Sequence, residues 1–317
     1  MKRITITLNP AQDRTLYLEQ FKLHRTNRAR KVMTQVGGKG INVSNTLEAF
    51  GYDSLAIVLL AGESGEQIQR DLDGHRYGCS TVWIDGSSRL NLKIMDESEQ
   101  AMTEVNDVSP VITMSQFQDL WAILEESVEA GDIVMLCGSA PQGLPPSFYG
   151  EIAEFVRLRH ATLILDADGE NFRAGLEGIP AVIKPNAEEC QAYRGSDVPL
   201  NEADYRSLIQ EWLMSGIRYC VVSLGARGAL FGSEQGIVSM PGLKVDVVST
   251  TGAGDSMVAA LAIGLSEGLD NLELYRLAMA VSGATVETAG TQPARRSRVI
   301  ELMKEMNVEG RGGWYEN

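Results

Sequence analysis

Strand-like and helical segments alternate along this chain, and that alternation limits its fold more than any other feature. Between residues 132 and 224, four short apolar runs are separated by three stretches with helical spacing. The runs are 132–137, 162–165, 182–184 and 219–224, and the helical stretches are 146–159, 188–193 and 202–215. Strands that alternate with helices call for a parallel sheet with helices on both faces. We therefore predict an α/β fold in three layers, with a mostly parallel sheet between two layers of helices.

The rest of the chain fits the same scheme. Further strands are predicted at 4–8, 54–60, 81–84 and 243–248, with two antiparallel strands before the last of these, and further helices at 41–50, 66–73, 115–130, 257–265, 272–288 and 298–306. No internal repeat, low-complexity tract or clear linker interrupts the pattern. We predict one domain over residues 1–317.

Two polar segments, at about 11–35 and 86–107, do not fit a buried parallel sheet. The second contains two alternating stretches, 89–95 and 100–105, joined by acidic residues, which is typical of a solvated hairpin. We expect both segments to form a small antiparallel layer beside the main sheet.

Charge and composition exclude several classes of protein. The net charge of -14 argues against a surface for nucleic acid or anionic membranes. No run approaches 18 apolar residues, and the N-terminus alternates like a strand without the apolar region of a signal peptide. The four cysteines are far apart and lack metal-binding spacing, and three of them lie in apolar or helical surroundings that suit buried thiols. A cytoplasmic location with no nucleic-acid or membrane partner is expected.

Small and polar residues recur directly after the predicted strands. They are Asn9, Gly37 and Gly38, Gly62, Gly138 and Ser139, Asp166, Asn186, Gly225, and Gly252 to Asp255. In open parallel sheets, ligands bind at the carboxyl ends of the strands. These residues are therefore expected to share one ligand-binding edge.

The last of these positions has a composition suited to phosphoryl transfer. Gly252, Ala253 and Gly254 form a small-residue turn, and Asp255 stands at the head of an apolar helix. Free N–H groups at a helix start can hold an anion, and an adjacent carboxylate can remove a proton from a hydroxyl. Taken alone, the same residues are equally compatible with an ordinary helix cap.

Neither common nucleotide-binding motif is present, since the chain has no G-x-x-x-x-G-K-[ST] and no G-x-G-x-x-G after a strand. The chain instead resembles the ribokinase-like (PfkB) family of carbohydrate kinases over essentially its whole length. The matching motifs, in order, are G-G-K-G-I-N-V at 37–43, K-P-N-A-E-E at 184–189, V-S-L-G-A-R-G at 222–228 and V-S-T-T-G-A-G-D-S-M at 248–257. Residues 8–10 with Asp13, 103–106 and 256–257 resemble the branch of 1-phosphofructokinase and tagatose-6-phosphate kinase.

The resemblance implies roles in catalysis and nucleotide binding. Asp255 resembles the general base, and Gly252, Ala253 and Gly254 resemble the anion hole for the transferring phosphoryl group. We expect the helix dipole to favour the ionised form of Asp255. ATP and Mg²⁺ are the implied cofactors. Glu189 resembles the residue that organises Mg²⁺ through water, and the implied nucleotide site is made of Lys184, Asn186, Ser223, Gly225 and Gly228.

On the acceptor side, the residues that resemble the family's sugar ligands are Asp13, Gly37, Gly38 and Asn42. Arg28 and Arg89 lie in the two polar segments, which match the family's lid. Each would reach a phosphate already present on the substrate, for which a guanidinium group is suited by its paired N–H donors. Lys39 is a further candidate for that phosphate.

The resemblance therefore implies an ATP-dependent kinase of a phosphosugar. Fructose 1-phosphate, converted to fructose 1,6-bisphosphate, is the first acceptor, and tagatose 6-phosphate is the alternative. A kinase of an unphosphorylated sugar or nucleoside is a further alternative, against which Arg28 and Arg89 count. A non-catalytic sugar or nucleotide sensor is another, against which an intact Asp255 counts. The lid forms the dimer contact in many relatives, so a homodimer is implied as a partner state.

Overall fold

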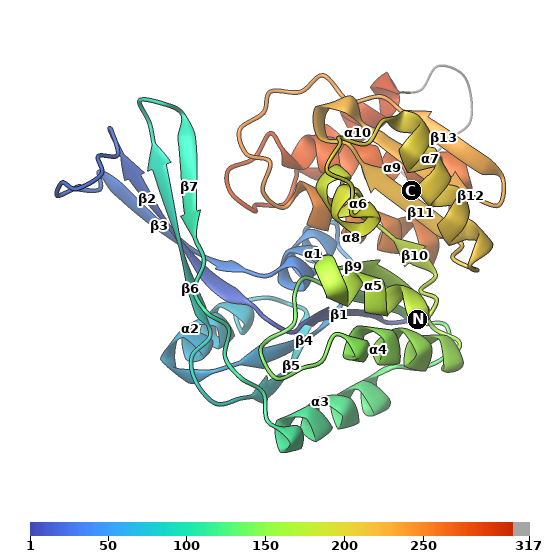
Figure 1. Cartoon of the computed structure of the whole chain (residues 1–317), viewed down its shortest axis with the longest axis horizontal. Helices are drawn as coiled ribbons and strands as arrows, with labels where there is room; N and C mark the ends of the chain where they lie inside the picture. The colour runs from blue at the N-terminus through green and yellow to red at the C-terminus, as the bar shows by residue number, and fades with distance from the viewer. Residues whose placement is uncertain (307–317) are drawn as a thin grey trace.

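The computed structural model describes residues 1–306, and the end of the predicted domain, 307–317, lies outside the described residues. Within the described part, a nine-stranded sheet runs through the molecule (Figure 1). In spatial order its strands are β13 (Gly236–Met240), β12 (Ala229–Ser233), β11 (Tyr219–Ser223), β10 (Val182–Ile183), β9 (Thr162–Asp166), β8 (Ile133–Cys137), β1 (Arg3–Thr7), β4 (Leu55–Leu60) and β5 (Gly78–Trp83). From β11 to β5 the strands are parallel, and β12 and β13 are antiparallel additions. The mostly parallel sheet is confirmed.

Helices cover both faces because the central strands are apolar on both sides. In β8, Val134 and Leu136 enter the core on one face, and Met135 and Cys137 enter the core on the other. The first face carries α3 (Met114–Ser127), α4 (Ser147–Leu158), α5 (Gly169–Glu177), α6 (Ala187–Arg194) and α7 (Glu202–Met214). The second face carries α1 (Lys39–Ala49), α2 (Gly62–Leu72), α8 (Ala253–Ser266), α9 (Asn271–Thr285) and α10 (Arg296–Glu305). The predicted three layers are confirmed.

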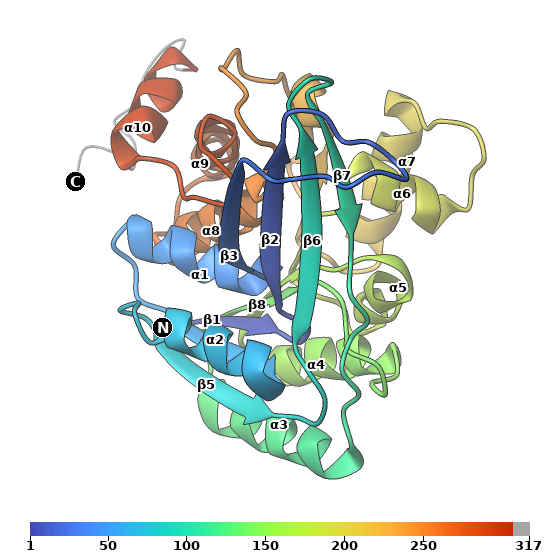
Figure 2. The ribbon, with the colours of Figure 1, turned by 90° about the vertical axis from the view of Figure 1, so that its left-hand side faces the viewer.

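A second sheet of four strands projects from this body (Figures 1 and 2), and we call it the lid. Its order is β3 (Lys31–Gly37), β2 (Ala11–Leu18), β6 (Arg89–Asp96) and β7 (Ala101–Val105). The two outer pairings are antiparallel, as predicted, and the central pairing of β2 with β6 is parallel. The two polar segments of the sequence thus build one separate layer.

The helix α8 is apolar over most of its length and is buried from Asp255 to Gly264. It packs between α1 and α9 on the second face of the sheet. A helix that is apolar on all sides belongs inside a protein. Its N-terminus opens at the carboxyl edge of the sheet, so Asp255 reaches that edge from a rigid element.

Three details of the sequence prediction are wrong. Residues 243–248 do not form a strand, and their alternation arises because Leu243, Val245 and Val247 line a cleft. The helix α5 was not predicted because it contains two glycines, of which Gly175 lets the helix approach Leu165 on β9 closely. The helix α2 begins at Gly62, so that residue starts a helix and does not line the ligand-binding edge.

The cysteines and the helix lengths agree with the composition. Cys137, Cys190 and Cys220 are buried free thiols, as predicted, and Cys79 is partly exposed. Among residues 1–306, no helix has both the length and the apolar character needed to cross a bilayer.

Candidate active site

A cleft of about 950 Å³ lies between the carboxyl edge of the main sheet and the lid. Nearly every residue expected at the site lines it: Asp13, Gly37, Gly38, Lys39, Asn42, Arg89, Lys184, Asn186, Glu189, Ser223, Gly225, Gly228, Gly252, Ala253, Gly254 and Asp255. Strand ends, helix starts and lid strands that are distant in sequence supply these residues. The prediction that post-strand residues share one edge is confirmed for most of them.

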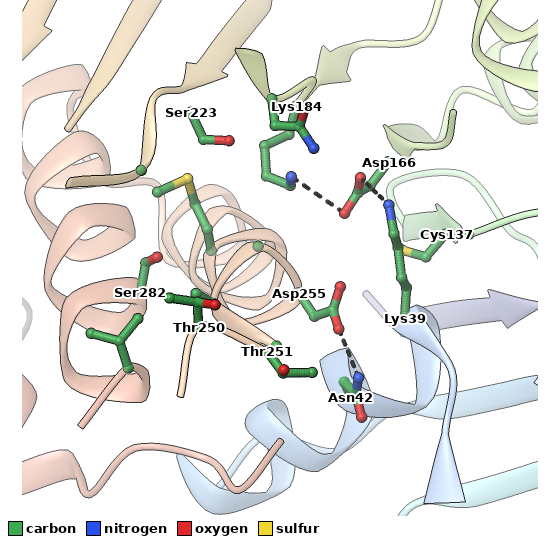
Figure 3. A pocket seen from close by; sticks show the side chains of 18 of the residues that line it. Lys39, Asn42, Cys137, Asp166, Lys184, Ser223, Thr250, Thr251, Asp255 and Ser282 are labelled. Carbon is green, nitrogen blue, oxygen red and sulfur yellow. Dashed lines mark hydrogen bonds and ion pairs between the residues drawn. The ribbon is translucent and has the colours of Figure 1, made fainter. Parts of the chain in front are cut away.

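Asp255 lies in the first turn of α8 and is 7% exposed. The amide Nδ2 of Asn42 donates a hydrogen bond of 2.7 Å to Oδ2 of Asp255 (Figure 3). Burial, followed by the negative charge of Asp166, raises the pKa of Asp255 to about 6. The pKa is therefore raised, whereas the expected effect of the helix dipole was to favour the ionised form; burial and the charge of Asp166 act in the opposite direction. The carboxylate is still mostly ionised at pH 7, and a pKa near the working pH suits a general base.

The start of α8 provides donors beside this carboxylate. Gly252 is the N-cap residue with φ of 81°, a left-handed conformation that favours glycine, and no side chain caps the helix. The first N–H groups of an α-helix have no acceptor within the helix, so this terminus can receive an anion. Gly254 also lies close to Lys184, whose Nζ would be 3.2 Å from a Cβ at this position.

Asp166, at the end of β9, connects two lysines in the floor of the cleft (Figure 3). Its side chain is 1% exposed, with Lys39 Nζ at 3.1 Å from Oδ1 and Lys184 Nζ at 3.4 Å from Oδ2. Burial acts to raise the pKa of Asp166, but the two ammonium groups outweigh it and lower that pKa. Burial acts to lower the pKa of Lys39, but Asp166, Glu189 and Asp255 outweigh it and raise that pKa. Lys39 is thus held as a cation beside Asp255, and Lys184 contacts the other oxygen of Asp166.

Lys39 is expected from the family resemblance as a ligand for the acceptor's phosphate. In the structure its ammonium group contacts Asp166 and lies 3.7 Å from Oε1 of Glu189, so it faces the catalytic floor. The role of Lys39 toward the acceptor stays a prediction.

Glu189 and Asn186 form a reciprocal cap at the start of α6. The N–H of Glu189 donates to Oδ1 of Asn186, and the N–H of Asn186 donates to Oε2 of Glu189, each at 2.8 Å. Burial raises the pKa of Glu189. Within residues 1–306, no cluster of three or more His, Cys, Asp or Glu is arranged to hold a metal ion. The side-chain oxygens of Glu189 and Asn186 fit Mg²⁺, because this ion keeps most of its water and is held largely by nucleotide phosphates.

The end of the cleft near Ser223 has an apolar wall that the sequence alone did not predict. Ser223 and the loop from Gly225 to Gly228 lead into it from β11. The wall consists of Leu243, Val245, Val247, Met279 and Val286. Its apolar side chains suit the flat ring of a base next to a polar phosphate site.

The lid contributes one face of its sheet to the cleft. Arg89 Nη2 donates 2.7 Å to the carbonyl of Asn9, and Arg89 Nε is buried without a hydrogen-bond partner within the described residues. The same holds for Asn9 Oδ1, Asn42 Oδ1 and Thr7 Oγ1. Buried polar atoms without partners are costly, so Arg89 Nε suits a hydroxyl or phosphate oxygen of a ligand, and the amide oxygens of Asn9 and Asn42 suit its hydroxyl groups.

Arg28 is the one expected site residue that the structure does not bring to the cleft. It is exposed in the loop between β2 and β3, at the outer end of the lid. Its role toward a substrate phosphate stays a prediction.

Asn91 and Lys93 line the cleft but were not predicted as functional residues, and Asp166 was expected at the ligand-binding edge without a specific role. The available signal for Asp166 was its position directly after a strand. For Asn91 and Lys93, the available signal was the interval of two residues between Arg89, Asn91 and Lys93, which puts all three side chains on one face of a strand.

The comparisons with known proteins agree with this geometry. The model of the pfkB family of carbohydrate kinases matches residues 5–298. A tagatose-6-phosphate kinase from Staphylococcus epidermidis is 29% identical over 309 residues, which cover 96% of this chain and 98% of that protein. Ribokinase from Thermotoga maritima shares the fold, with a TM-score of 0.75 at 19% identity over 96% of this chain and 99% of that one.

Phosphofructokinase-2 from Escherichia coli is also similar. In its complex with potassium the TM-score is 0.90 at 26% identity, over 96% of this chain and 99% of that one. In its complex with fructose-6-phosphate the TM-score is 0.88 at 25% identity, over 96% and 98%. With a family model that spans almost all of its length and a cleft built from that family's motifs, this chain belongs to the pfkB family of carbohydrate kinases.

Proposed function

We propose that this chain transfers the γ-phosphoryl group of ATP to the free primary hydroxyl of a phosphorylated ketohexose. The observation that carries the proposal is one cleft that holds both Asp255, beside an uncapped helix start, and a partly buried lid arginine, Arg89. The first group suits proton removal from a hydroxyl, and the second suits an acceptor that already has a phosphate.

In this reaction the hydroxyl oxygen of the acceptor forms a bond to the γ-phosphorus, and the bond from that phosphorus to the β–γ bridging oxygen breaks. ADP leaves, and Asp255 takes the hydroxyl proton. The N–H groups at Gly252 to Gly254 stabilise the charge that gathers on the phosphoryl oxygens in the transition state. Lys39 and Lys184, fixed by Asp166, add positive charge at the same place.

ATP lies along the cleft with its base against the apolar wall and its phosphates toward Lys184. Ser223, Gly225 and Gly228 line that end of the cleft. Mg²⁺, when bound with the nucleotide, neutralises phosphate charge, and Glu189 with Asn186 would hold it through water.

Fructose 1-phosphate is the first acceptor that we propose, because residues 248–257 resemble the motif of 1-phosphofructokinases. Tagatose 6-phosphate is the alternative, and the tagatose-6-phosphate kinase of Staphylococcus epidermidis supports it. The partly buried arginine of the lid, Arg89, counts against an unphosphorylated sugar or nucleoside. The buried general base counts against a non-catalytic sensor, which has no use for one.

An ADP-release assay tests the proposal with fructose 1-phosphate, tagatose 6-phosphate, fructose 6-phosphate, ribose and adenosine as acceptors. We expect kcat/KM to be highest for one of the phosphosugars. Arg89→Ala should raise KM for that phosphosugar by at least about tenfold and leave KM for ATP nearly unchanged. Higher kcat/KM for ribose or adenosine, or an equal change of both KM values in Arg89→Ala, would refute the assignment.

The lid also has an outer face that fits a homodimer. Side chains on that face, opposite the cleft, include Val32, Leu90 and Val105, which are 46%, 40% and 55% exposed. Apolar side chains grouped on an exposed sheet favour association. We therefore include a homodimer through the lid in the proposal.

A further inference from the structure

An ion pair on the cleft face of the lid stands next to the acceptor side of the site. Lys93 Nζ lies 2.9 Å from Oδ2 of Asp13, and Asn91 Nδ2 donates 2.9 Å to Oδ1 of the same carboxylate. Both oxygens of Asp13 therefore have a fixed donor. Because each oxygen of a carboxylate can accept a second hydrogen bond, Asp13 can still receive hydroxyl groups from a sugar.

The register of the lid sheet produces this arrangement. Asp13 on β2 pairs with Asn91 on the parallel strand β6, and Lys93 lies two residues further along the same face. On the other side, Gly37 leaves room for the carboxylate, because a Cβ there would stand 2.8 Å from Oδ2 of Asp13. Three strands thus fix one carboxylate at the mouth of the cleft.

The pair is sheltered, in contrast with ion pairs elsewhere on the lid. The side chains of Lys93 and Asp13 are 12% and 16% exposed, whereas those of Arg30 and Glu19 at the outer end are 58% and 74% exposed. Exposed pairs contribute little, but removal of one partner from a sheltered pair leaves the other charge uncompensated. The cleft face of the lid also carries Glu104, which pairs in register with Lys93, so this surface has two carboxylates to balance.

The balance of charge on the cleft face of the lid becomes more important if the acceptor is itself an anion. A sugar phosphate brings a charge between about -1.5 and -2 at neutral pH. If Asp13 binds the hydroxyl groups of that sugar, its own charge opposes the approach of the phosphate unless a cation stands beside it. Arg89 lies at the base of the same strand face and is tied to the carbonyl of Asn9.

We propose that Lys93 is a positioning residue that determines acceptor specificity: it compensates and orients Asp13 so that this carboxylate can bind the hydroxyls of an anionic sugar. This inference rests on the proposed function. Lys93 acts through Asp13, and its ammonium group is not itself the phosphate ligand. Its effect should therefore depend on the charge at residue 13.

A double-mutant cycle on the full-length enzyme tests the proposal. Lys93→Met should raise KM for the best phosphosugar by at least about tenfold, with kcat and KM for ATP changed by less than about twofold. In an Asp13→Asn background, which has no charge to compensate, the same change should raise KM by no more than about threefold. Lys93→Arg should restore most of the wild-type KM. Equal fold-changes in the two backgrounds, or an equal rise of KM for ATP, would overturn the role of Lys93.

Two controls accompany the cycle. Lys31→Met removes a lysine from the same sheet at an exposed position beside Tyr17, and it should leave both KM values unchanged. Thermal melting shows whether Lys93→Met folds, and Lys93→Gln replaces it in the cycle if it does not. Wild-type enzyme that turns over none of the phosphosugars refutes the proposed function, whereas an active wild type with equal fold-changes refutes only the role of Lys93.

Discussion

Asp255 is an acidic side chain in a buried position, and this burial raises its pKa. Its pKa of about 6 places it where it is ionised at neutral pH and yet basic enough to take a proton. We predict that Asp255→Asn lowers kcat by roughly 10²- to 10⁴-fold, the usual contribution of a general base. A coupled assay of ADP release measures the change, and calorimetric titration should find ATP binding nearly intact.

Asp119→Asn is the matched control, since it makes the same chemical change at an exposed position of α3. Its kcat should equal that of the wild type. Turnover close to wild type in Asp255→Asn would remove Asp255 from the reaction.

The pH profile should depend on Asp166. Because protonated Asp255 cannot accept a proton, kcat/KM should fall as the pH drops below about 6. Asp166→Asn removes a negative charge that raises the pKa of Asp255, and it releases Lys39 and Lys184, whose charges lower it. The acid limb of the profile should therefore move to lower pH, by on the order of 1 unit.

The comparison between the two enzymes is made with one phosphosugar, so the titration of its phosphate, also near pH 6, affects both profiles equally. An acid limb that stays in place, or moves to higher pH, would contradict the electrostatic link between Asp166 and Asp255.

At the level of the elements, a substitution in the first turn of α8 should change activity without a comparable change in stability. Gly254→Ala adds a good helix former, so the free energy of unfolding should change by less than about 1 kcal/mol. The added methyl group would stand 3.2 Å from Lys184 Nζ and intrude on the phosphoryl site. We expect kcat to fall by about 10²-fold or more, as when a transition-state donor is lost.

Ala262→Gly makes the reverse change in the buried part of the same helix. It should lower the melting temperature and leave kcat unchanged. If Gly254→Ala retained full activity, the start of α8 would not be the anion hole.

The elements were largely predictable because their signals are local. The strands of the main sheet are short apolar runs, and the cap of α6 is visible as Asn186 followed three residues later by Glu189. The failures have a common physical reason: they concern residues whose surroundings come from distant parts of the chain. Residues 243–248 look like a strand because a cleft wall is as apolar as a sheet, and α5 looks broken because Gly175 packs on a strand.

The site was predictable where a motif places the residue and unpredictable where only the fold does. Asp255 and its glycines are adjacent in sequence, so the family motif predicted them together, although the residues alone fit an ordinary helix cap equally well. Asp166 and Lys93 meet their partners from 127 and 80 residues away: Asp166 pairs with Lys39, and Lys93 with Asp13. The pKa of Asp255 was misjudged for the same reason, since burial and Asp166 act on it through the tertiary structure.

At the scale of the whole molecule, the lid presents two faces with different tasks. One face carries Asp13, Arg89 and Lys93 toward the cleft, and the other exposes Val32 and Val105. We predict that the wild type sediments as a dimer at micromolar concentration and that Val32→Glu with Val105→Glu converts it to a monomer, because charges would be buried in the contact.

Val198→Glu is the control, at a position that is 70% exposed and far from the lid in sequence. This variant should sediment like the wild type. A wild type that is monomeric at micromolar concentration would exclude the proposed homodimer.

The burial of α8 has a consequence for how the protein is made. All nine strands of the main sheet precede residue 253, and the second face of β8 to β12 is covered mainly by α8, α9 and α10, which are synthesised after these strands. Until these helices are synthesised, that apolar face of the sheet is uncovered and Asp255 is absent. Such a surface invites misassembly until the last helices emerge. Because Asp255 lies on α8, the residue that we propose as the general base becomes available only when the helices that cover this face are being made.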